Sequence, residues 1–319
     1  MTIQKTALVL GVTGGIGGQL SDALLAHGWE VVAMVRDPAK AAKLCDPRVR
    51  LIPGDAMNPV DTLKAAQGVQ VIAHCVSPPG YKDWNMLVLP MIDNTIAAAK
   101  SVGARILLPG TVYNFGLDAF PVLKASSPQH PVARKGAIRV EMERRLEQAS
   151  RTGVSVLIVR AGDFFGGKSG GSNWMSQGLV RPGKPLAAVS SPNTPDVGHP
   201  WAYLPDLAET MALLLDRGAQ SDFERYHFAG MYDSTGHDMT DAIRMASGKP
   251  NLKVSSFPWW MIILLSPFVT LFREMREMRY LWRYDHRLDN AELVAVLGRE
   301  PHTPLVDAVR ITLRNLGCI

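Results

Sequence analysis

Residues 6–17, TALVLGVTGGIG, decide the fold predicted for this chain. Thr6 to Leu10 is an apolar run typical of a buried parallel strand, and Gly18 to His27 has the apolar spacing of one helix face. The glycines between them let the backbone turn sharply and approach a pyrophosphate, whose charge the N–H groups and dipole of the following helix attract. The stretch therefore predicts a dinucleotide phosphate site. Its contacts are expected from Gly11, Thr13, Gly14, Gly15, Ile16 and Gly17.

The end of the second predicted strand indicates which dinucleotide binds. Glu30 to Val35 is apolar and is followed by Arg36, 19 positions after Gly17. An acidic side chain at this point would bind the adenosine ribose diol, whereas an arginine pairs with a 2′-phosphate. Because Val35 stands where that acid is expected, the sequence favours NADP(H) over NAD(H). The alternative is that Arg36 only marks the end of the strand and contacts no cofactor.

Four further apolar runs alternate with helical patterns. They cover residues 49–53, 69–76, 105–108 and 154–159, and the longest helical patterns cover 84–102 and 135–148. Parallel strands joined by helices need right-handed crossovers, which place helices on both sides of the sheet. The sequence thus predicts the α/β class, as a Rossmann-type doubly wound parallel sheet with helices on both faces and a smaller, mostly C-terminal substrate-binding region.

The chain is expected to divide near residue 160, where Gly-rich and aromatic segments replace the regular alternation. The predicted parts are an NADP(H)-binding Rossmann core at 1–160 and a mixed region at 161–319, with substrate-binding segments at 162–204 and 231–319 and a helix and strand returning to the core at 205–230. The returning helix is expected to be capped by Asp206.

Loops at the carboxyl ends of the strands supply further expected cofactor contacts, because these ends meet at one crevice of an open parallel sheet. Asp55 is expected to accept from the adenine amino group, and the chain after Val76 to cover the pyrophosphate or the ribose. The contacts expected from these two loops are Asp55, Ala56, Val76 and Ser77. His74, inside the fourth apolar run, is predicted to be a satisfied core histidine.

Composition excludes several classes of partner. The net charge of +5 is small, and the basic residues at 135–151 alternate with Glu141, Glu143 and Glu147, which predicts a solvated helix face and no nucleic-acid surface. The three cysteines lack metal or redox spacing, and no metal site is predicted. With no secretion leader visible, we expect a cytoplasmic protein.

The most apolar stretch, Phe257 to Phe272, is interrupted by prolines and is too short to span a bilayer. It is predicted to be a buried helix of the substrate region. The alternative is a helix at a membrane surface, which Trp259, Trp260 and the arginines that follow would suit.

Several motifs together resemble the extended or atypical branch of the short-chain dehydrogenase/reductase superfamily, which includes epimerase/dehydratase-like proteins. The matching segments are the G-x-x-G-x-x-G turn at 11–17, Thr111-Val112-Tyr113, Arg160 to Gly166 (RAGDFFG), Trp201 to Ala208 (WAYLPDLA) and 297–305 (LGREPHTPL). The resemblance implies an oxidoreductase that binds NADP(H) and a small-molecule substrate. It places Ala161, Asp163 and Phe164 at the cofactor amide, and it implies a homodimer paired through helices 83–100 and 134–148.

The resemblance fails at the catalytic motif. Such enzymes use a Ser or Thr and a Tyr-x-x-x-Lys pair, in which the tyrosine exchanges the proton and the lysine lowers its pKa and binds the nicotinamide ribose. Here Pro109 stands at the serine position, Lys135 at the tyrosine position and Arg139 at the lysine position. The remaining catalytic candidates are Lys135, Tyr113, Thr111 and Arg139, and Pro109 and Lys135 are also expected at the cofactor.

Three interpretations of this site stay open. In the first, Lys135 is a desolvated acid or stabilises an oxyanion, Tyr113 or Thr111 donates to that oxyanion, and Arg139 holds the ribose or phosphate. In the second, the protein is a non-catalytic NADP(H)-binding sensor or regulatory protein. In the third, Lys135 is structural and another residue performs the chemistry. A solvated surface position is the alternative for Lys135 itself.

Aromatic residues after position 160 suggest a small, apolar or aromatic carbonyl or hydroxyl substrate. The substrate contacts expected are Phe165, Trp174, His199, Trp201 and Tyr203. His199 is expected in a turn, between Gly198 and Pro200. The alternative for the aromatic side chains is an ordinary core.

Overall fold

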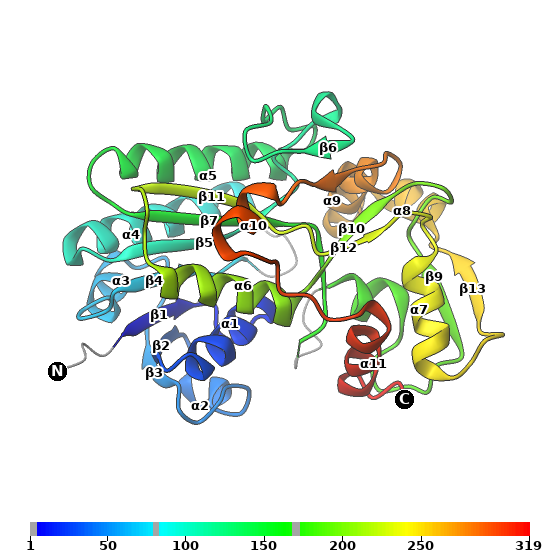
Figure 1. Cartoon of the computed structure of the whole chain (residues 1–319), viewed down its shortest axis with the longest axis horizontal. Coiled ribbons are helices and arrows are strands. Elements are labelled where there is room, and N and C mark those ends of the chain that lie inside the picture. The colour runs from blue at the N-terminus through cyan, green and yellow to red at the C-terminus, as the bar shows by residue number, and fades with distance from the viewer. Residues whose placement is uncertain (1–4, 79–82, 168–172) are drawn as a thin grey trace.

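A computed structural model describes residues 5–78, 83–167 and 173–319 of the chain, and its centre is a seven-stranded parallel sheet (Figure 1). The strand order is β11-β7-β5-β4-β1-β2-β3. The strands are β1 (Thr6–Leu10), β2 (Glu30–Val35), β3 (Arg50–Pro53), β4 (Val71–His74), β5 (Arg105–Thr111), β7 (Val156–Ala161) and β11 (Phe223–His227). The strand order reverses direction at β1, so the predicted doubly wound sheet is confirmed.

Two layers of helices cover the sheet, and alternate residues of each strand face opposite layers. In β1, Ala7 and Val9 pack toward one layer while Leu8 and Leu10 pack toward the other. The first layer contains α1 (Gly15–Ala26), α2 (Pro38–Ala41), α6 (Leu204–Arg217) and α10 (Ala291–Leu297), and the second contains α3 (Pro59–Ala65), α4 (Trp84–Val102) and α5 (Arg134–Ser150). His74 of β4 faces the second layer with Nδ1 2.8 Å from Thr95 Oγ1, and burial lowers its pKa to about 3. The predicted core position is confirmed, but Nε2 has no hydrogen-bond partner among the described residues, so the histidine is satisfied at one ring nitrogen only.

β5 runs three residues beyond its predicted end. Pro109 lies inside the strand and pairs with Val159, whereas pairing with β4 stops at Leu107. Proline donates no ladder hydrogen bond, and it is tolerated here because β5 has a neighbour on one side only beyond that point. The predicted loop at Pro109 is therefore wrong.

Asp206 is not the N-cap of α6. The helix begins at Leu204 after Tyr203, without a side-chain cap, and Asp206 lies in its first turn. Its carboxylate instead accepts two hydrogen bonds of 2.7 Å from the backbone N–H and the hydroxyl of Thr303. These hydrogen bonds connect the C-terminal segment at Thr303 to α6 of the core.

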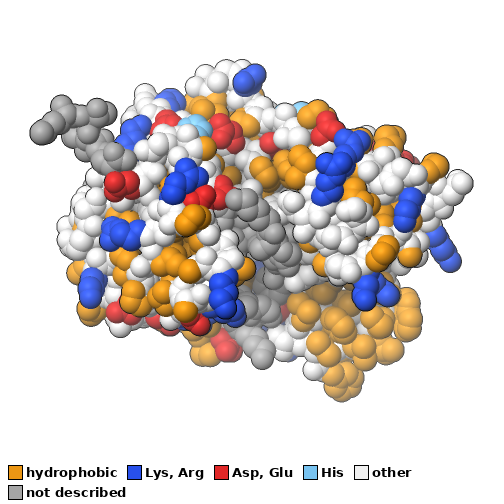
Figure 2. Space-filling model, turned by 90° about the horizontal axis from the view of Figure 1, so that it is seen from below, with side chains coloured by type: hydrophobic (Ala, Val, Ile, Leu, Met, Phe, Trp, Pro, Cys, Tyr) orange, Lys and Arg blue, Asp and Glu red, His pale blue; other side chains and the backbone are white. Residues whose placement is uncertain are grey.

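The remaining elements form a smaller region beside the sheet, with its own core around Trp201 and Trp282. Its strands are β8 (Asp163–Phe165), β10 (His199–Tyr203) and β12 (Met231–Asp233) in one sheet, and the pairs β9 (Ala188–Ser191) with β13 (Lys253–Ser256) and β6 (Val122–Leu123) with β14 (Arg287–Leu288). Its helices are α7 (Asp238–Ser247), α8 (Trp259–Leu265), α9 (Thr270–Met278) and α11 (Leu305–Asn315), with short turns at Leu117–Ala119, Met175–Leu179 and Arg279–Trp282. Figure 2 shows apolar side chains gathered at one corner of the molecule, at the lower right.

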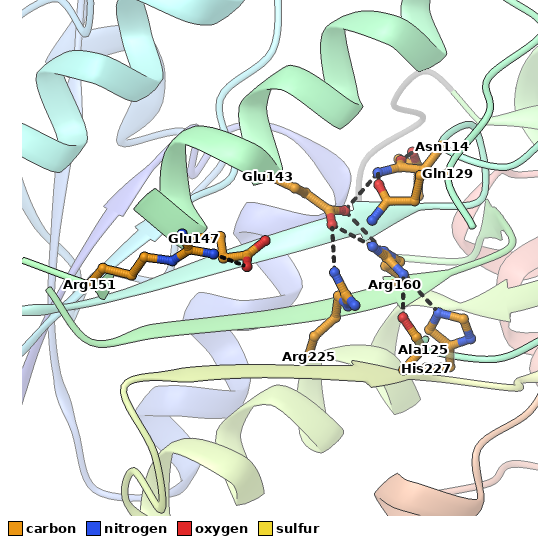
Figure 3. Close-up of polar contacts among 10 residues, drawn as sticks. Asn114, Ala125, Gln129, Glu143, Glu147, Arg151, Arg160, Arg225 and His227 are labelled. Carbon is orange, nitrogen blue, oxygen red and sulfur yellow. Dashed lines mark hydrogen bonds and ion pairs between the residues drawn. The ribbon is translucent and has the colours of Figure 1, made fainter. Parts of the chain in front are cut away.

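Glu143 anchors α5 to the sheet through a buried ion pair (Figure 3). Its carboxylate accepts from Arg160 of β7 at 3.0 and 2.5 Å and from Asn114 at 2.9 Å. Arg160 is fully buried and also contacts the Ala125 carbonyl and His227. The solvated face predicted for α5 is therefore wrong at Glu143, because its side chain points inward to a buried arginine.

Removing Arg160 should be costly. We expect Arg160→Met to lower the free energy of unfolding by about 3–5 kcal/mol, because the buried carboxylate of Glu143 loses both hydrogen bonds from Arg160 and is left with Arg225, at 4.0 Å, as its charged partner. The matched control is Arg151→Met at the C-terminal end of α5, where the exposed pair of Arg151 with Glu147 contributes about 0–1 kcal/mol. Urea denaturation of both variants measures the difference, and equal losses would contradict the assignment.

Candidate cofactor and active site

Only glycine fits the tightest points of the β1–α1 turn. Gly11 has φ of +89°, and a Cβ there would lie 2.7 Å from the Cys75 carbonyl oxygen. A Cβ on Gly17 would lie 2.2 Å from the Gly11 carbonyl oxygen. The backbone of the turn therefore packs directly on the end of β4 and on the start of α1.

The start of α1 suits an anion. Gly14 is its N-cap, no side chain caps the helix, and its first turn carries no acidic residue. The first N–H groups of any helix lack intrahelical partners and carry the positive end of the dipole. A pyrophosphate fits this cradle, and NADP(H) or NAD(H) would place one there.

The carboxyl ends of β2 and β3 lie beside this turn. Arg36 is exposed just after β2, while Asp37 caps α2 by accepting from Lys40 N–H at 3.0 Å. Asp55 follows β3 and accepts from Met57 N–H at 3.0 Å. Asp37 therefore serves as a cap, and Arg36 is an exposed cation at this strand end. The loops also bring Ala56, Val76 and Ser77 to this edge.

Arg36 should set the cofactor preference. We expect Arg36→Ala to raise the Kd for NADPH about tenfold and to leave the Kd for NADH unchanged, because only NADPH carries the 2′-phosphate. Titration of cofactor fluorescence measures both constants. Arg50→Ala is the matched control, since Arg50 is also exposed but lies at the opposite end of β3. Equal effects on both cofactors would exclude this role.

Lys135 is buried, so a solvated surface position is excluded. The residue is 3 % exposed, and its Nζ lies 3.5 Å from Glu274 Oε2 and 5.9 Å from the Trp84 ring centre. Burial lowers the pKa of Lys135 to about 8, against the opposing effect of Glu274, Glu277 and Asp163. A lysine in this state holds a proton at neutral pH and releases it more readily than a surface lysine does.

Two glutamates of α9 complete the start of α5. Arg134 donates two hydrogen bonds to the Glu277 carboxylate, from its backbone N–H at 3.1 Å and from its side-chain Nε at 3.0 Å. Its Nη2 donates to the Glu274 carboxylate at 3.3 Å. They counter two cations at the positive end of a helix dipole. Sequence reasoning missed both residues because they follow Lys135 by about 140 positions. The one available signal was the unfavourable placement of Lys135 at a helix start.

The other catalytic candidates lie on α5, at the end of β5 and just after it. Gly136 allows the first turn of α5 to lie on the Tyr113 backbone, since a Cβ would stand 2.2 Å from the Tyr113 carbonyl oxygen. Thr111 ends β5, with Oγ1 3.4 Å from Asn114 Oδ1. Arg139 lies one turn further along α5, with its guanidinium carbon 5.3 Å from the Trp84 ring centre. The fold thus packs the Tyr113 backbone against the first turn of α5 and sets Arg139 beside Trp84.

Asp163 is paired with a histidine. Asp163 Oδ2 lies 3.1 Å from His199 Nε2, and His199 Nδ1 lies 3.2 Å from the Leu281 carbonyl oxygen. Both ring nitrogens of His199 therefore lie within hydrogen-bond distance of an oxygen atom. His199 is 2 % exposed and stacks on Trp282, with ring centres 3.7 Å apart. The predicted turn position is wrong, because His199 begins strand β10.

Most of the aromatic side chains expected at the substrate lie inside the smaller core. Phe165, Trp201 and Tyr203 are nearly or fully buried, and Phe165 packs on both of the others. Trp174 is half-buried and meets Trp282 edge to face, with ring centres 4.7 Å apart. Burial favours the core interpretation for the first three and leaves Trp174 as the partly accessible ring.

Ala161 ends β7 and is buried, and Phe164 packs against the core cluster of the α1–α6 layer. Within residues 5–78, 83–167 and 173–319, no group of three His, Cys, Asp or Glu side chains could hold a metal ion.

A doubly wound sheet with this glycine turn defines the class of nucleotide-binding Rossmann proteins. Residues 11–188 match the family model described as NAD(P)H-binding. This segment is more than half of the chain, and the protein therefore belongs to the NAD(P)H-binding family. A comparison with curated proteins finds no match.

Solved structures of similar fold include sugar-nucleotide epimerases. UDP-glucose 4-epimerase from Bifidobacterium longum, in complex with NAD+ and UDP, is 16 % identical with a TM-score of 0.73, over 98 % of each chain. UDP-glucuronic acid 4-epimerase from Bacillus cereus, in complex with NAD, is 16 % identical with a TM-score of 0.74, over 98 % of this chain and 96 % of that one. These likenesses confirm the predicted Rossmann-type doubly wound fold.

Proposed function

We propose that the protein is an NADP(H)-dependent oxidoreductase of the extended or atypical short-chain dehydrogenase type, acting on a small apolar or aromatic carbonyl or hydroxyl compound. The observation that carries the proposal is the buried Lys135 at the position of the family's tyrosine, with its pKa lowered to about 8. General acids work best when their pKa lies near the working pH. The family match supports the nicotinamide cofactor, and the position of Arg36 supports NADP(H).

The residues around the crevice have separate roles in the proposed reaction. NADPH, when bound on the glycine turn, supplies the hydride. Lys135 donates a proton to the carbonyl oxygen or stabilises the charge on it, and Glu274 holds the ammonium group in place. Arg139 remains protonated, so it serves to hold a ribose or a phosphate and exchanges no proton.

The aromatic residues near Lys135 and in the smaller region support an apolar substrate. Trp84 is buried beside both Lys135 and Arg139, and Trp174 is partly accessible in the smaller region. Apolar walls with a few polar groups are typical of small-molecule pockets. The epimerases of similar fold bind UDP or UDP-sugars, so a nucleotide sugar is the competing substrate class in any screen.

Lys135→Ala tests the proposal. With any carbonyl that supports NADPH oxidation, we expect the variant to lose at least about a hundredfold in turnover, because general acids contribute about 10²–10⁴. The Kd for NADPH should change little. Lys64→Ala, at an exposed position on α3, is the control. An unchanged rate in Lys135→Ala would remove this lysine from the mechanism.

The pH profile tests the proton donor directly. Turnover for carbonyl reduction should be constant below about pH 8 and fall above it, because the ammonium form is lost as pH passes the pKa of Lys135. Glu274 raises that pKa, so Glu274→Gln should move the falling limb to lower pH. Glu277→Gln is the matched control, and it should move the falling limb less, because Glu277 raises the pKa of Lys135 less than Glu274 does. A limb that stays in place in Glu274→Gln would contradict the coupling.

The second candidate function is a non-catalytic NADP(H) sensor or regulatory protein. The specific observation in its favour is that the ammonium of Lys135 is already paired with Glu274 and that Pro109 replaces the family's serine. Purified protein that binds NADPH, yet oxidises none with carbonyls, enones or nucleotide sugars, would support the sensor over the enzyme.

A further inference from the structure

The helices α8 and α9 form a hairpin that presents a large apolar surface. Seven exposed apolar side chains lie within twelve consecutive positions of it, and Trp260, Leu264 and Phe268 are 70, 64 and 85 % exposed. The seven are Trp260, Ile263, Leu264, Leu265, Phe268, Val269 and Leu271. They account for the apolar corner in Figure 2. Contiguous patches of this kind mark contact with a protein, a ligand or a membrane.

An arginine-lined cavity adjoins this surface. It has a volume of about 310 Å³, and its walls include Arg276, Arg279 and Arg283 together with Ile263 of the apolar patch. The guanidinium of Arg279 lies 5.6 Å from the Trp259 ring centre, and its Nε is buried without a hydrogen-bond partner among the described residues. Arg276 donates to Ser266 at 3.3 Å, in the turn of the hairpin.

The charges around the cavity leave it positive. Within the described part of the chain, no carboxylate forms an ion pair with Arg273, Arg276, Arg279 or Arg283, whereas the glutamate on the cavity wall, Glu277, is paired with Arg134. The glutamates of α9 thus serve the start of α5. Arg273, Arg276, Arg279 and Arg283 therefore remain available to an external anion.

We propose that the α8–α9 hairpin docks on the surface of an anionic phospholipid bilayer. Its apolar side chains enter the boundary between headgroups and acyl chains, and the arginine-lined cavity receives lipid phosphates. Aromatic and aliphatic residues beside arginines are typical of helices that lie in this interface. Among the described residues no helix is long and apolar enough to cross a membrane, and α8 and α9 are 7 and 9 residues long, which fits a surface position.

A second copy of the chain fits this surface less well. In a two-fold symmetric contact the same patch meets itself, so the arginines of one copy would approach those of the other. A bilayer with anionic headgroups supplies the opposite charge. The proposal does not depend on the function proposed above, and its test needs no enzymatic activity.

Vesicle flotation of the full chain tests the proposal. We expect binding to phosphatidylcholine vesicles that contain about a third phosphatidylglycerol, at least about tenfold above binding to phosphatidylcholine alone, and a loss of binding as salt rises. Leu264→Ser/Phe268→Ser and Arg276→Gln/Arg283→Gln should each reduce binding about tenfold or more. The matched controls are Val60→Ser, at an apolar position 70 % exposed on α3, and Arg50→Gln, and both should bind as the unmodified protein does.

Three results would overturn the proposal. One is no enrichment on anionic vesicles, and another is unchanged binding by the hairpin variants. The third is light scattering that shows a dimer which Leu264→Ser/Phe268→Ser dissociates, without vesicle binding by the unmodified protein; this result would assign the surface to self-association. Thermal unfolding of each variant must match that of the unmodified protein, since the replaced side chains are exposed.

Discussion

The buried carboxylate of Glu143 is the constraint on which the candidate site depends. It binds Arg160 of β7 and Asn114 after β5, so it fixes the rotation and height of α5 above the sheet (Figure 3). Lys135 lies on the same helix about two turns earlier. A buried ion pair adds little net stability compared with an apolar pair of the same size, but breaking it by moving one partner away is costly. The pair therefore favours one position of α5 on the sheet over others. The position of Lys135 relative to the sheet follows from it.

The smaller region provides the second constraint on α5. Glu274 and Glu277 of α9 reach the start of α5 and pair with Lys135 and Arg134. The lysine is therefore defined by contacts from both parts of the chain. The same α9 also carries Arg276, which lines the outer cavity, so one short helix joins the candidate site to the apolar surface.

Differences from the predictions arise where tertiary contacts overrule local patterns. Pro109 predicts the end of a strand, but β7 continues to pair with β5 through Thr111. Asp206 is a residue type that often caps helices, but its carboxylate lies in the first turn of α6 and accepts hydrogen bonds from the backbone N–H and the hydroxyl of Thr303. His199 lies between Gly198 and Pro200, as in a turn, yet pairing with β12 extends it. In each case the partner is remote in the sequence, and the local pattern contains no information about it.

The sequence by itself determined the Rossmann sheet and the glycine turn. Strand alternation and the need for positive φ at Gly11 or close approach at Gly17 act within a few residues, so they can be read locally. Only the tertiary structure decided that Lys135 is buried, that its pKa falls to about 8, and that Glu274 is its partner. Desolvation and ion pairing depend on which distant side chains exclude water from a group, and that is a property of the folded chain.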